Sequence, residues 1–431
     1  MNLSKPVLIA AWLALAAAPA WARLPLQGFT TPAGHHVLLL PDKIQDTVAI
    51  AMAFQCGLAC DSEKDYAAGL LAPGLSMEGA GGQSSSEIFE NFMDTGGLFS
   101  FSANSDQTYL SLSAPSRGLD DAVKIANLVL TKPDFPEKKL IQKRDRLATA
   151  IDENRLDADI KAQLAFIDAA VGPSSYDHYF SPRGEDLRDV TTGQLKAWLH
   201  RHVATDGVMI AVVGNIDEAK AGAAVDNLLA GLPAKSDDTK FPVLNFLPAK
   251  PEPIMVAGDG GEQAIINFGM IGKRPEKLEE WFGGAMLARI FAQGQKSRLF
   301  AQVREATGQT YGLDSDFNYY EQLGMNRIKG RIGTTGLDQS LAVIRKAWQE
   351  FRADGPTEAE IKEARTDMFN ELNNLMRDHE EAANRLRDYL TGHWSVDELA
   401  QMPEIIAGVD LHDKALRERF FPPDPITVIA K

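Results

Sequence analysis

Histidine and cysteine most often bind metals or act as nucleophiles, and this chain has few of either. Its 431 residues include eight histidines and two cysteines. His35 and His36 are adjacent, whereas His200 and His202 lie two apart. Neither spacing places two imidazoles on one face of a helix, and the other four histidines are dispersed. The histidines therefore predict no metal site.

The two cysteines, Cys56 and Cys60, lie in the stretch FQCGLAC (54–60). An oxidising compartment would allow a disulfide between them across a turn that contains Gly57. Two reduced thiols packed in the protein interior are the alternative, and the spacing alone leaves both states open. With no histidine nearby, the pair makes a weak case for zinc.

A serine-rich stretch, GGQSSSE (81–87), leads into a predicted helix over 84–97 and overlaps its first residues. Ser84 and Glu87 have the spacing of a capping box, and Gly96 is a typical helix end. The apolar residues between them recur at helical spacing: Ile88, Phe89, Phe92 and Met93. These serines are therefore interpreted as helix caps, and a stand-alone hydrolase with a serine nucleophile has no supporting motif.

The helices that would position a site occur twice. The stretches DFPEKKLIQKRDRL (134–147) and DGPTEAEIKEARTDM (354–368) both begin with Asp, one residue and Pro, and then continue as a charged helix. An amphipathic helix precedes each of them, beginning at Leu119 and at Leu337. The chain is therefore predicted to contain an internal duplication.

Strand-like runs follow the same repeat. Runs rich in β-branched residues begin and end each half: 47–54, 208–214, 264–270 and 426–430. In 99–114, leucines alternate with serines, which predicts a strand with one polar face. The Pro-rich, charged stretch 232–253 is typical of a linker. We predict an α+β fold with two homologous α/β-roll domains, 23–231 and 254–431. Each would combine an antiparallel sheet with helices, and the two would face each other as a clamshell.

Residues 1–22 have the features of a secretory signal peptide. Lys5 precedes a short apolar run, and Ala20-Trp21-Ala22 is a typical cleavage site. We predict cleavage after Ala22 and export to the periplasm. No stretch is long and apolar enough to span a bilayer. The formal net charge of −15 argues against nucleic acid as a partner.

The stretch GLLAPGLSMEG (69–79) begins a series of motifs that resembles the pitrilysin/insulinase family of zinc metallopeptidases, in its processing-peptidase-like branch. The resemblance covers essentially the whole mature chain. The features that match in order are Gly69-Leu70, Met77, Gly81, the capped helix, Gly96-Gly97 and SANSDQTY (102–109). Active members carry H-x-x-E-H at the positions held here by Ala72, Leu75 and Ser76.

The resemblance implies that this motif has lost its chemistry. Two histidines four residues apart bind one zinc, and the glutamate between them is the general base. Ala72 and Leu75 offer no lone pairs, and a Ser76 hydroxyl is a poor ligand. Pro73 and Gly74 are expected to disturb the helix as well. The family's downstream glutamate ligand aligns with Glu153, which alone is expected to be a solvated helix residue, so no zinc is expected in this chain.

The second half keeps a motif of the family. SRLFAQVREATGQTYGLDSDF (297–317) resembles its C-domain signature, in which an Arg and a Tyr seven residues apart face the zinc across the cleft. Here they are Arg304 and Tyr311. A phenol O–H can stabilise the oxyanion of a tetrahedral intermediate, and a guanidinium can bind substrate carbonyls. A charged helix followed by a packing tyrosine is the alternative interpretation.

Some bacterial members of this family are heterodimers in which one chain carries H-x-x-E-H and the other the Arg/Tyr pair. The resemblance implies that this chain is the second kind, with zinc in the partner and peptides or unfolded proteins as substrates. Peptide would bind in extended form along a sheet edge formed by Gly97, Ser102, Ala103 and Asn104. The alternative is a catalytically inert structural or peptide-binding protein, like the family relatives in the core of respiratory complexes.

Overall fold

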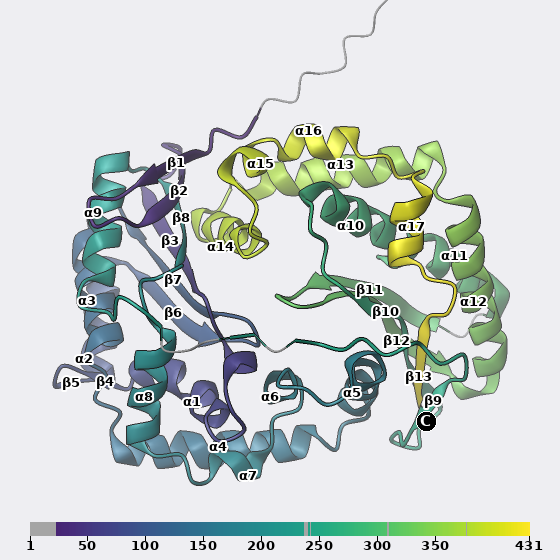
Figure 1. Cartoon of the computed structure of the whole chain (residues 1–431), viewed down its shortest axis with the longest axis horizontal. Helices are drawn as coiled ribbons and strands as arrows, with labels where there is room; N and C mark the ends of the chain where they lie inside the picture. Colours follow the sequence, from purple (N-terminus) through teal and green to yellow (C-terminus); the bar gives the residue numbers. More distant parts are fainter. Residues whose placement is uncertain (1–22, 237–239, 242, 308–309, 376) are drawn as a thin grey trace, which may run out of the picture.

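The computed structural model describes residues 23–431 except 237–239, 242, 308–309 and 376. Each half of the chain contributes one open sheet, and the two sheets lie on opposite sides of the molecule (Figure 1). The N-terminal sheet has, in spatial order, strands β1 (Gln27–Thr30), β2 (His36–Pro41), β8 (Met209–Gly214), β3 (Thr47–Phe54), β7 (Thr108–Pro115) and β6 (Leu98–Ala103). The short strands β4 (Gly79–Ala80) and β5 (Gln83–Ser84) form a separate hairpin.

The C-terminal sheet repeats this arrangement with one strand fewer. Its strands, in spatial order, are β9 (Ile254–Val256), β13 (Ile426–Ala430), β10 (Gln263–Gly272), β12 (Gly324–Gly333) and β11 (Thr310–Tyr319). In each sheet one pair is parallel, β2 with β8 and β9 with β13, and the remaining pairs are antiparallel. The predicted α+β fold with two homologous halves is confirmed.

The central strand β3 shows why these sequences form sheets. Its residues Val48 to Phe54 are all buried, because β3 is flanked by β7 and β8 and both faces of the sheet are covered. Larger apolar side chains such as Ile50 and Met52 belong to the core of the N-terminal half. The alternate residues, Ala49 and Ala51, are small and allow a helix to approach closely.

The helices surround the two sheets. In the N-terminal half they are η1 (Leu58–Cys60), α1 (Tyr66–Ser76), α2 (Ser85–Thr95), α3 (Leu119–Thr131), α4 (Glu137–Asn154), α5 (Ala158–Val171), α6 (Asp177–Phe180), α7 (Gly184–Leu187), α8 (Thr192–His202) and α9 (Glu218–Leu229). In the C-terminal half they are α10 (Leu278–Ala292), α11 (Arg298–Thr307), η2 (Thr334–Gly336), α12 (Leu337–Asp354), α13 (Glu358–Leu375), α14 (His379–Leu390), α15 (Val396–Ala400), α16 (Met402–Gly408) and α17 (Lys414–Phe420).

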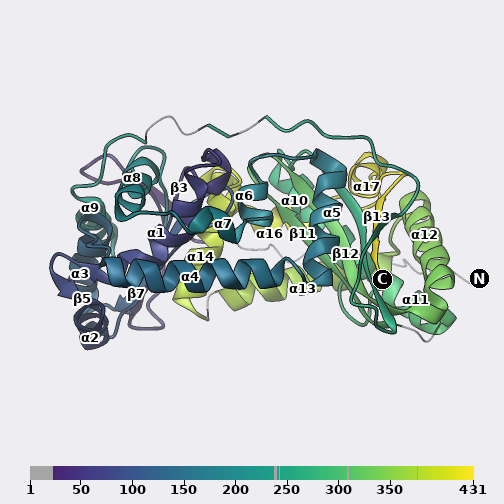
Figure 2. The ribbon, with the colours of Figure 1, turned by 90° about the horizontal axis from the view of Figure 1, so that it is seen from below.

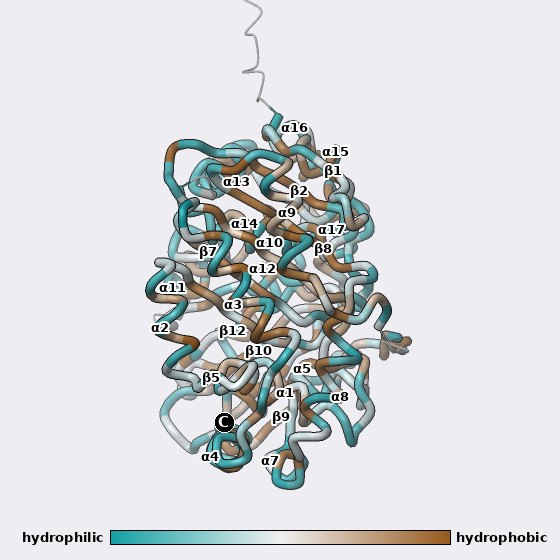
Figure 3. The backbone as a smooth tube through the Cα atoms, turned by 90° about the vertical axis from the view of Figure 1, so that its left-hand side faces the viewer, coloured by the Kyte–Doolittle hydropathy of each residue, from teal (hydrophilic) through white to brown (hydrophobic). Residues whose placement is uncertain are grey.

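Several predicted helices are present with their expected signals. Ser84 and Glu87 form the capping box at the start of α2, and Gly96 ends it with a φ of 68°. The duplicated helices α4 and α13 begin at Glu137 and Glu358, after the proline of each repeat. Helix α4 is rich in charged residues and buries only Leu140, Ala148 and Ile151, in agreement with the charged helix that the sequence predicts. Figure 3 shows this helix end-on, with mostly hydrophilic colour on the part that faces the viewer.

The stretch 99–114, predicted as a strand with a polar face, is a hairpin of β6 and β7. Asn104 causes the break, because its side-chain Oδ1 accepts the backbone N–H groups of Asp106 and Gln107, each at 2.9 Å. This Asx-type turn reverses the chain. Strand β6 therefore becomes the outermost strand of the N-terminal sheet.

The two halves exchange a helix. Helix α5 of the first half packs on β10 and β13, whereas α14 of the second half packs on β3 and β8. His379, at the start of α14, has its Nε2 atom 2.9 Å from Asp42 Oδ2. An ion pair between Arg331 and Asp159 ties α5 to the other sheet. Figure 2 shows residues 243–253 crossing between the halves along one side of the molecule. The interface between the halves therefore includes elements of both.

Candidate functional site

The positions of the degenerate zinc motif lie inside the N-terminal core. Ala72, Leu75 and Ser76 on α1 are each fully buried. Ala72 and Leu75 belong to the apolar cluster of that half, and the Ser76 hydroxyl donates to the carbonyl of Pro73 at 2.7 Å. Ala72 and Leu75 therefore offer no atom that could bind a metal ion, and the buried Ser76 hydroxyl is already hydrogen-bonded.

Helix α1 continues through Pro73 and Gly74, contrary to the expected disturbance. The proline ring would crowd the carbonyl of residue 69, which is a glycine packed against Leu58 and Trp198. Gly74 faces solvent, and its carbonyl accepts from Lys143 Nζ at 3.1 Å. The packing of α1 thus outweighs the backbone hydrogen bond that Pro73 cannot make and the low helix propensity of Gly74. Helix α1 therefore remains intact although it lacks the H-x-x-E-H residues.

Glu153, which aligns with the family's third ligand, is exposed near the end of α4. Across the described residues, no group of three or more His, Cys, Asp and Glu side chains is arranged to hold a metal ion. The donor set that the family's zinc requires does not occur around α1, so the residues present do not fit that ion.

We therefore expect the purified mature chain to bind no stoichiometric zinc. After dialysis against metal-free buffer, elemental analysis should find zinc only at trace level. A homologue with the intact H-x-x-E-H motif, treated in the same way, is the control and should retain its zinc. One tightly held zinc per chain would contradict the interpretation of α1 as a helix without metal ligands.

The two residues of the C-domain motif lie on consecutive elements. Arg304 is exposed on α11, and its guanidinium carbon lies 5.8 Å from the centre of the Phe300 ring. Tyr311 lies in β11, the outermost strand of the C-terminal sheet. The pairing with β12 shifts register between Thr310 and Gly312, so Tyr311 occupies an irregularity of the ladder. The Tyr311 side chain lies outside the described part of the chain, and its role stays a prediction.

The expected peptide-binding edge is divided between a strand and its flanks. Ser102 and Ala103 lie in β6, which pairs on one side only, with β7. Gly97 follows the end of α2, and its N–H donates to the carbonyl of Phe92 at 3.0 Å. Asn104 forms the turn after β6. The strand therefore presents free N–H and C=O groups along its outer edge, which an extended peptide could pair with.

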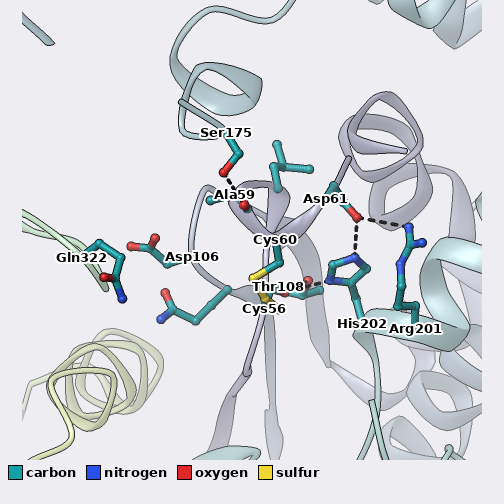
Figure 4. Close-up of a disulfide and its surroundings, with 12 residues drawn as sticks. Cys56, Ala59, Cys60, Asp61, Asp106, Thr108, Ser175, Arg201, His202 and Gln322 are labelled. Carbon is teal, nitrogen blue, oxygen red and sulfur yellow. Dashed lines mark hydrogen bonds and ion pairs between the residues drawn. A yellow bond between two sulfur atoms is a disulfide. The ribbon is translucent and has the colours of Figure 1, made fainter. Parts of the chain in front are cut away.

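The structure joins Cys56 and Cys60 by a disulfide (Figure 4). The loop that it closes is held from several sides. The carbonyl of Cys56 accepts from the Thr108 hydroxyl at 3.0 Å, and that of Ala59 from the Ser175 hydroxyl at 2.6 Å. The disulfide loop thus fixes the start of α1 against the β6–β7 hairpin.

Next to this loop, the buried carboxylate of Asp61 is surrounded by donors. Trp198 Nε1 donates to it at 2.7 Å, and Arg201 forms an ion pair with it at 3.1 Å. His202 Nε2 lies 2.8 Å from the same carboxylate, and its Nδ1 lies 3.3 Å from the carbonyl of Cys56. Because each neighbour is already engaged, the cluster holds α8 on α1 and is not a catalytic arrangement. The sequence spacing of His200 and His202 gives no sign of it.

Comparison with known proteins agrees with this architecture. Residues 189–368 match the family model described as "Peptidase M16 inactive domain". A crystal structure of a peptidase M16 inactive domain from Pseudomonas fluorescens superposes with a TM-score of 0.85 at 21% identity, covering 94% of this chain and 98% of that one. The periplasmic protease PqqL from Escherichia coli gives 0.78 at 14% identity, over 100% of this chain and 49% of that one. These structures share the fold of two similar halves.

Curated relatives include an uncharacterized zinc protease of Rickettsia felis, 22% identical over 66% of this chain and 68% of that protein. Another, from Bacillus subtilis, is 23% identical over 69% of this chain and 71% of that protein. The fold is thus that of the two-halved M16 peptidases. The match to the M16 family model over residues 189–368 confirms the predicted resemblance to the pitrilysin/insulinase family. Helix α1 of this chain carries Ala72, Leu75 and Ser76 in place of the H-x-x-E-H residues.

Proposed function

We propose that this chain is the subunit without zinc in a periplasmic M16 peptidase heterodimer. Arg304 and Tyr311 would complete the active site around the zinc of a homologous partner that carries H-x-x-E-H. The observation that carries this proposal is the contrast between the two halves. The first half has buried side chains without adequate zinc ligands at its motif positions, whereas the second retains the Arg/Tyr signature on α11 and β11.

The position of that signature supports a role in trans. Arg304 is exposed, and Tyr311 lies in a strand at the edge of its sheet. Irregularities of a β-ladder are often found beside active sites, where they redirect a side chain. A guanidinium and a phenol at such positions can bind the carbonyl and the oxyanion of a substrate held by another chain.

Further features of the chain support export and a peptide substrate. A disulfide between Cys56 and Cys60 is suited to an oxidising compartment such as the periplasm. The predicted signal peptide, which lies outside the described residues, points the same way. The free edge of β6 offers main-chain groups to an extended peptide. Among the described residues, no helix is long and apolar enough to cross a bilayer.

The test is the composition of the complex. The mature chain should assemble one-to-one with the homologous H-x-x-E-H chain of the same organism, and native mass spectrometry should find one zinc per pair. The isolated chain should contain none, which assigns the ion to the partner. A chain that remains alone or self-associates in the presence of that partner would favour the alternative of an inert, peptide-binding protein, which the free β6 edge also supports.

A further inference from the structure

A cavity of about 380 Å³ lies where the two halves meet. The β6–β7 turn contributes Asn104 and Asp106 to its wall, and the hairpin of β11 and β12 contributes residues 317–321. The end of α14 closes it with residues that include Arg387 and Thr391. Figure 1 shows the hairpin extending toward the N-terminal sheet beside α14. Residues of both halves therefore line the cavity, which lies beside the end of the edge strand β6.

Aromatic side chains form much of this wall. They are Tyr109, Trp281, Phe317, Tyr319, Tyr320 and Tyr389. The faces of such rings attract cations. The chain already uses one of them, because the guanidinium of Arg387 lies 4.3 Å from the centre of the Tyr109 ring. Arg387 is also bound to Asp388 and Asn384, so its charge is compensated within α14.

Asp106 is a buried acidic residue in the wall of the cavity, with only 3% of its surface exposed. Its Oδ2 atom accepts the backbone N–H of Glu321 at 2.9 Å, whereas its Oδ1 atom is buried without a hydrogen bond. Among the described residues, Asp106 has no salt bridge. Figure 4 shows its carboxylate directed toward Gln322 of the hairpin. A buried acceptor without a partner is costly, so this oxygen is a strong candidate to bind a donor.

The surroundings of the Asp106 carboxylate favour its protonated form, so a proton competes with any donor that binds there. Burial raises the pKa of the Asp106 carboxyl to about 7, and the Glu321 carboxylate adds to the rise. The backbone N–H of Glu321 and the hydroxyls of Tyr176 and Ser105 act in the opposite direction. The other charged or titratable groups around the cavity are Tyr109, Tyr179, Tyr319, Tyr320, Arg385, Arg387, Asp388 and Tyr389. Arg274 is paired with Glu321 and thus leaves Asp106 without a cation.

We propose that this cavity binds one basic side chain, lysine or arginine, of an extended peptide that lies along β6. The proposal deepens the proposed function, because it rests on a peptide held at that edge. Asn104 both follows β6 and lines the cavity, so a peptide that continues past Ala103 reaches its entrance. The cation would pair with Asp106 Oδ1, and its aliphatic stem would pack against the tyrosine rings. Because a cation stabilises the ionised carboxylate, binding releases the competing proton.

The test is calorimetric titration of the mature chain alone with two blocked heptapeptides, Ac-STVRVTS-NH2 and Ac-STVQVTS-NH2. The arginine peptide should bind more tightly than the glutamine peptide. Its affinity should fall about tenfold from pH 8 to pH 6, because below a pKa of about 7 the carboxyl must first lose a proton. The glutamine peptide should show no such dependence.

Asp106→Asn should remove both the arginine preference and the pH dependence, whereas Asp338→Asn, an exposed residue at the start of α12, should change neither. Equal binding of the two peptides by the unmodified chain, or no binding of either, would overturn the proposal even if Asp106→Asn fails to fold. Because no partner subunit is present, the outcome is independent of whether Arg304 and Tyr311 act in trans.

Discussion

Replacing Tyr311 by phenylalanine should lower the kcat of the reconstituted pair by about 10²–10³, because loss of one oxyanion donor costs about 2.7–4 kcal/mol of transition-state stabilisation. KM should change little, since the phenol acts on charge that develops only in the transition state. Size-exclusion chromatography should show the same complex as for the unmodified chain. The measurement is steady-state peptidase activity of the purified pair.

Two variants complete this experiment. Arg304→Ala should raise KM as well as lower kcat, because a guanidinium bound to substrate carbonyls acts in both the ground state and the transition state. Thr366→Val, which removes an exposed hydroxyl on α13, is the control and should retain full activity. Full activity of the Tyr311→Phe pair would remove the catalytic role, and the interpretation as an inert structural subunit would take its place.

Neither half of the chain should fold stably by itself. A protein of residues 23–231 lacks α14, whose buried residues Leu386 and Tyr389 belong to the cluster that covers Ala49 and Ala211 of the sheet. Burying one large apolar side chain contributes about 1.5–3 kcal/mol, which is a large part of a total stability of about 5–15 kcal/mol. Thermal unfolding followed by circular dichroism should show no cooperative transition for 23–231 alone.

Co-expression of 23–231 with 232–431 should restore a compact complex, because each part then supplies the helix that the other lacks. Within the full chain, Leu386→Ala should destabilise by about 2–5 kcal/mol. Arg385→Ala, on the exposed side of the same helix, should have little effect. Cooperative unfolding of each isolated half near the temperature of the full chain would show that the exchanged helices are dispensable.

Much of the fold was predictable because its signals are local. The capping box at Ser84 and the β-branched run of β3 depend only on near neighbours in sequence, and the structure has both. The exchange of α5 and α14 was not predictable, because an amphipathic pattern shows that a helix has a buried face but not which sheet covers it. The β6–β7 hairpin was missed because the side chain of one asparagine, Asn104, reverses the chain within an otherwise alternating run.

The candidate site divides in the same way. The loss of zinc ligands at Ala72, Leu75 and Ser76 is a property of residue types and can be interpreted directly. Asp106 could not be found, because an acidic residue in a turn is normally solvated and its burial depends on Glu321, more than 200 positions away. Helix α1 also continues through Pro73 because of tertiary packing, since a proline within a helix is tolerated when the surrounding core fixes the helix.

The central claim is that this chain completes a zinc site that another chain holds. Its most direct test compares the peptidase activity of the H-x-x-E-H partner alone with that of the partner plus this chain, at equal zinc content. We predict that the partner alone is nearly inactive and that activity rises with added chain until the ratio reaches one-to-one. Full activity of the partner alone, unchanged by this chain, would contradict the claim.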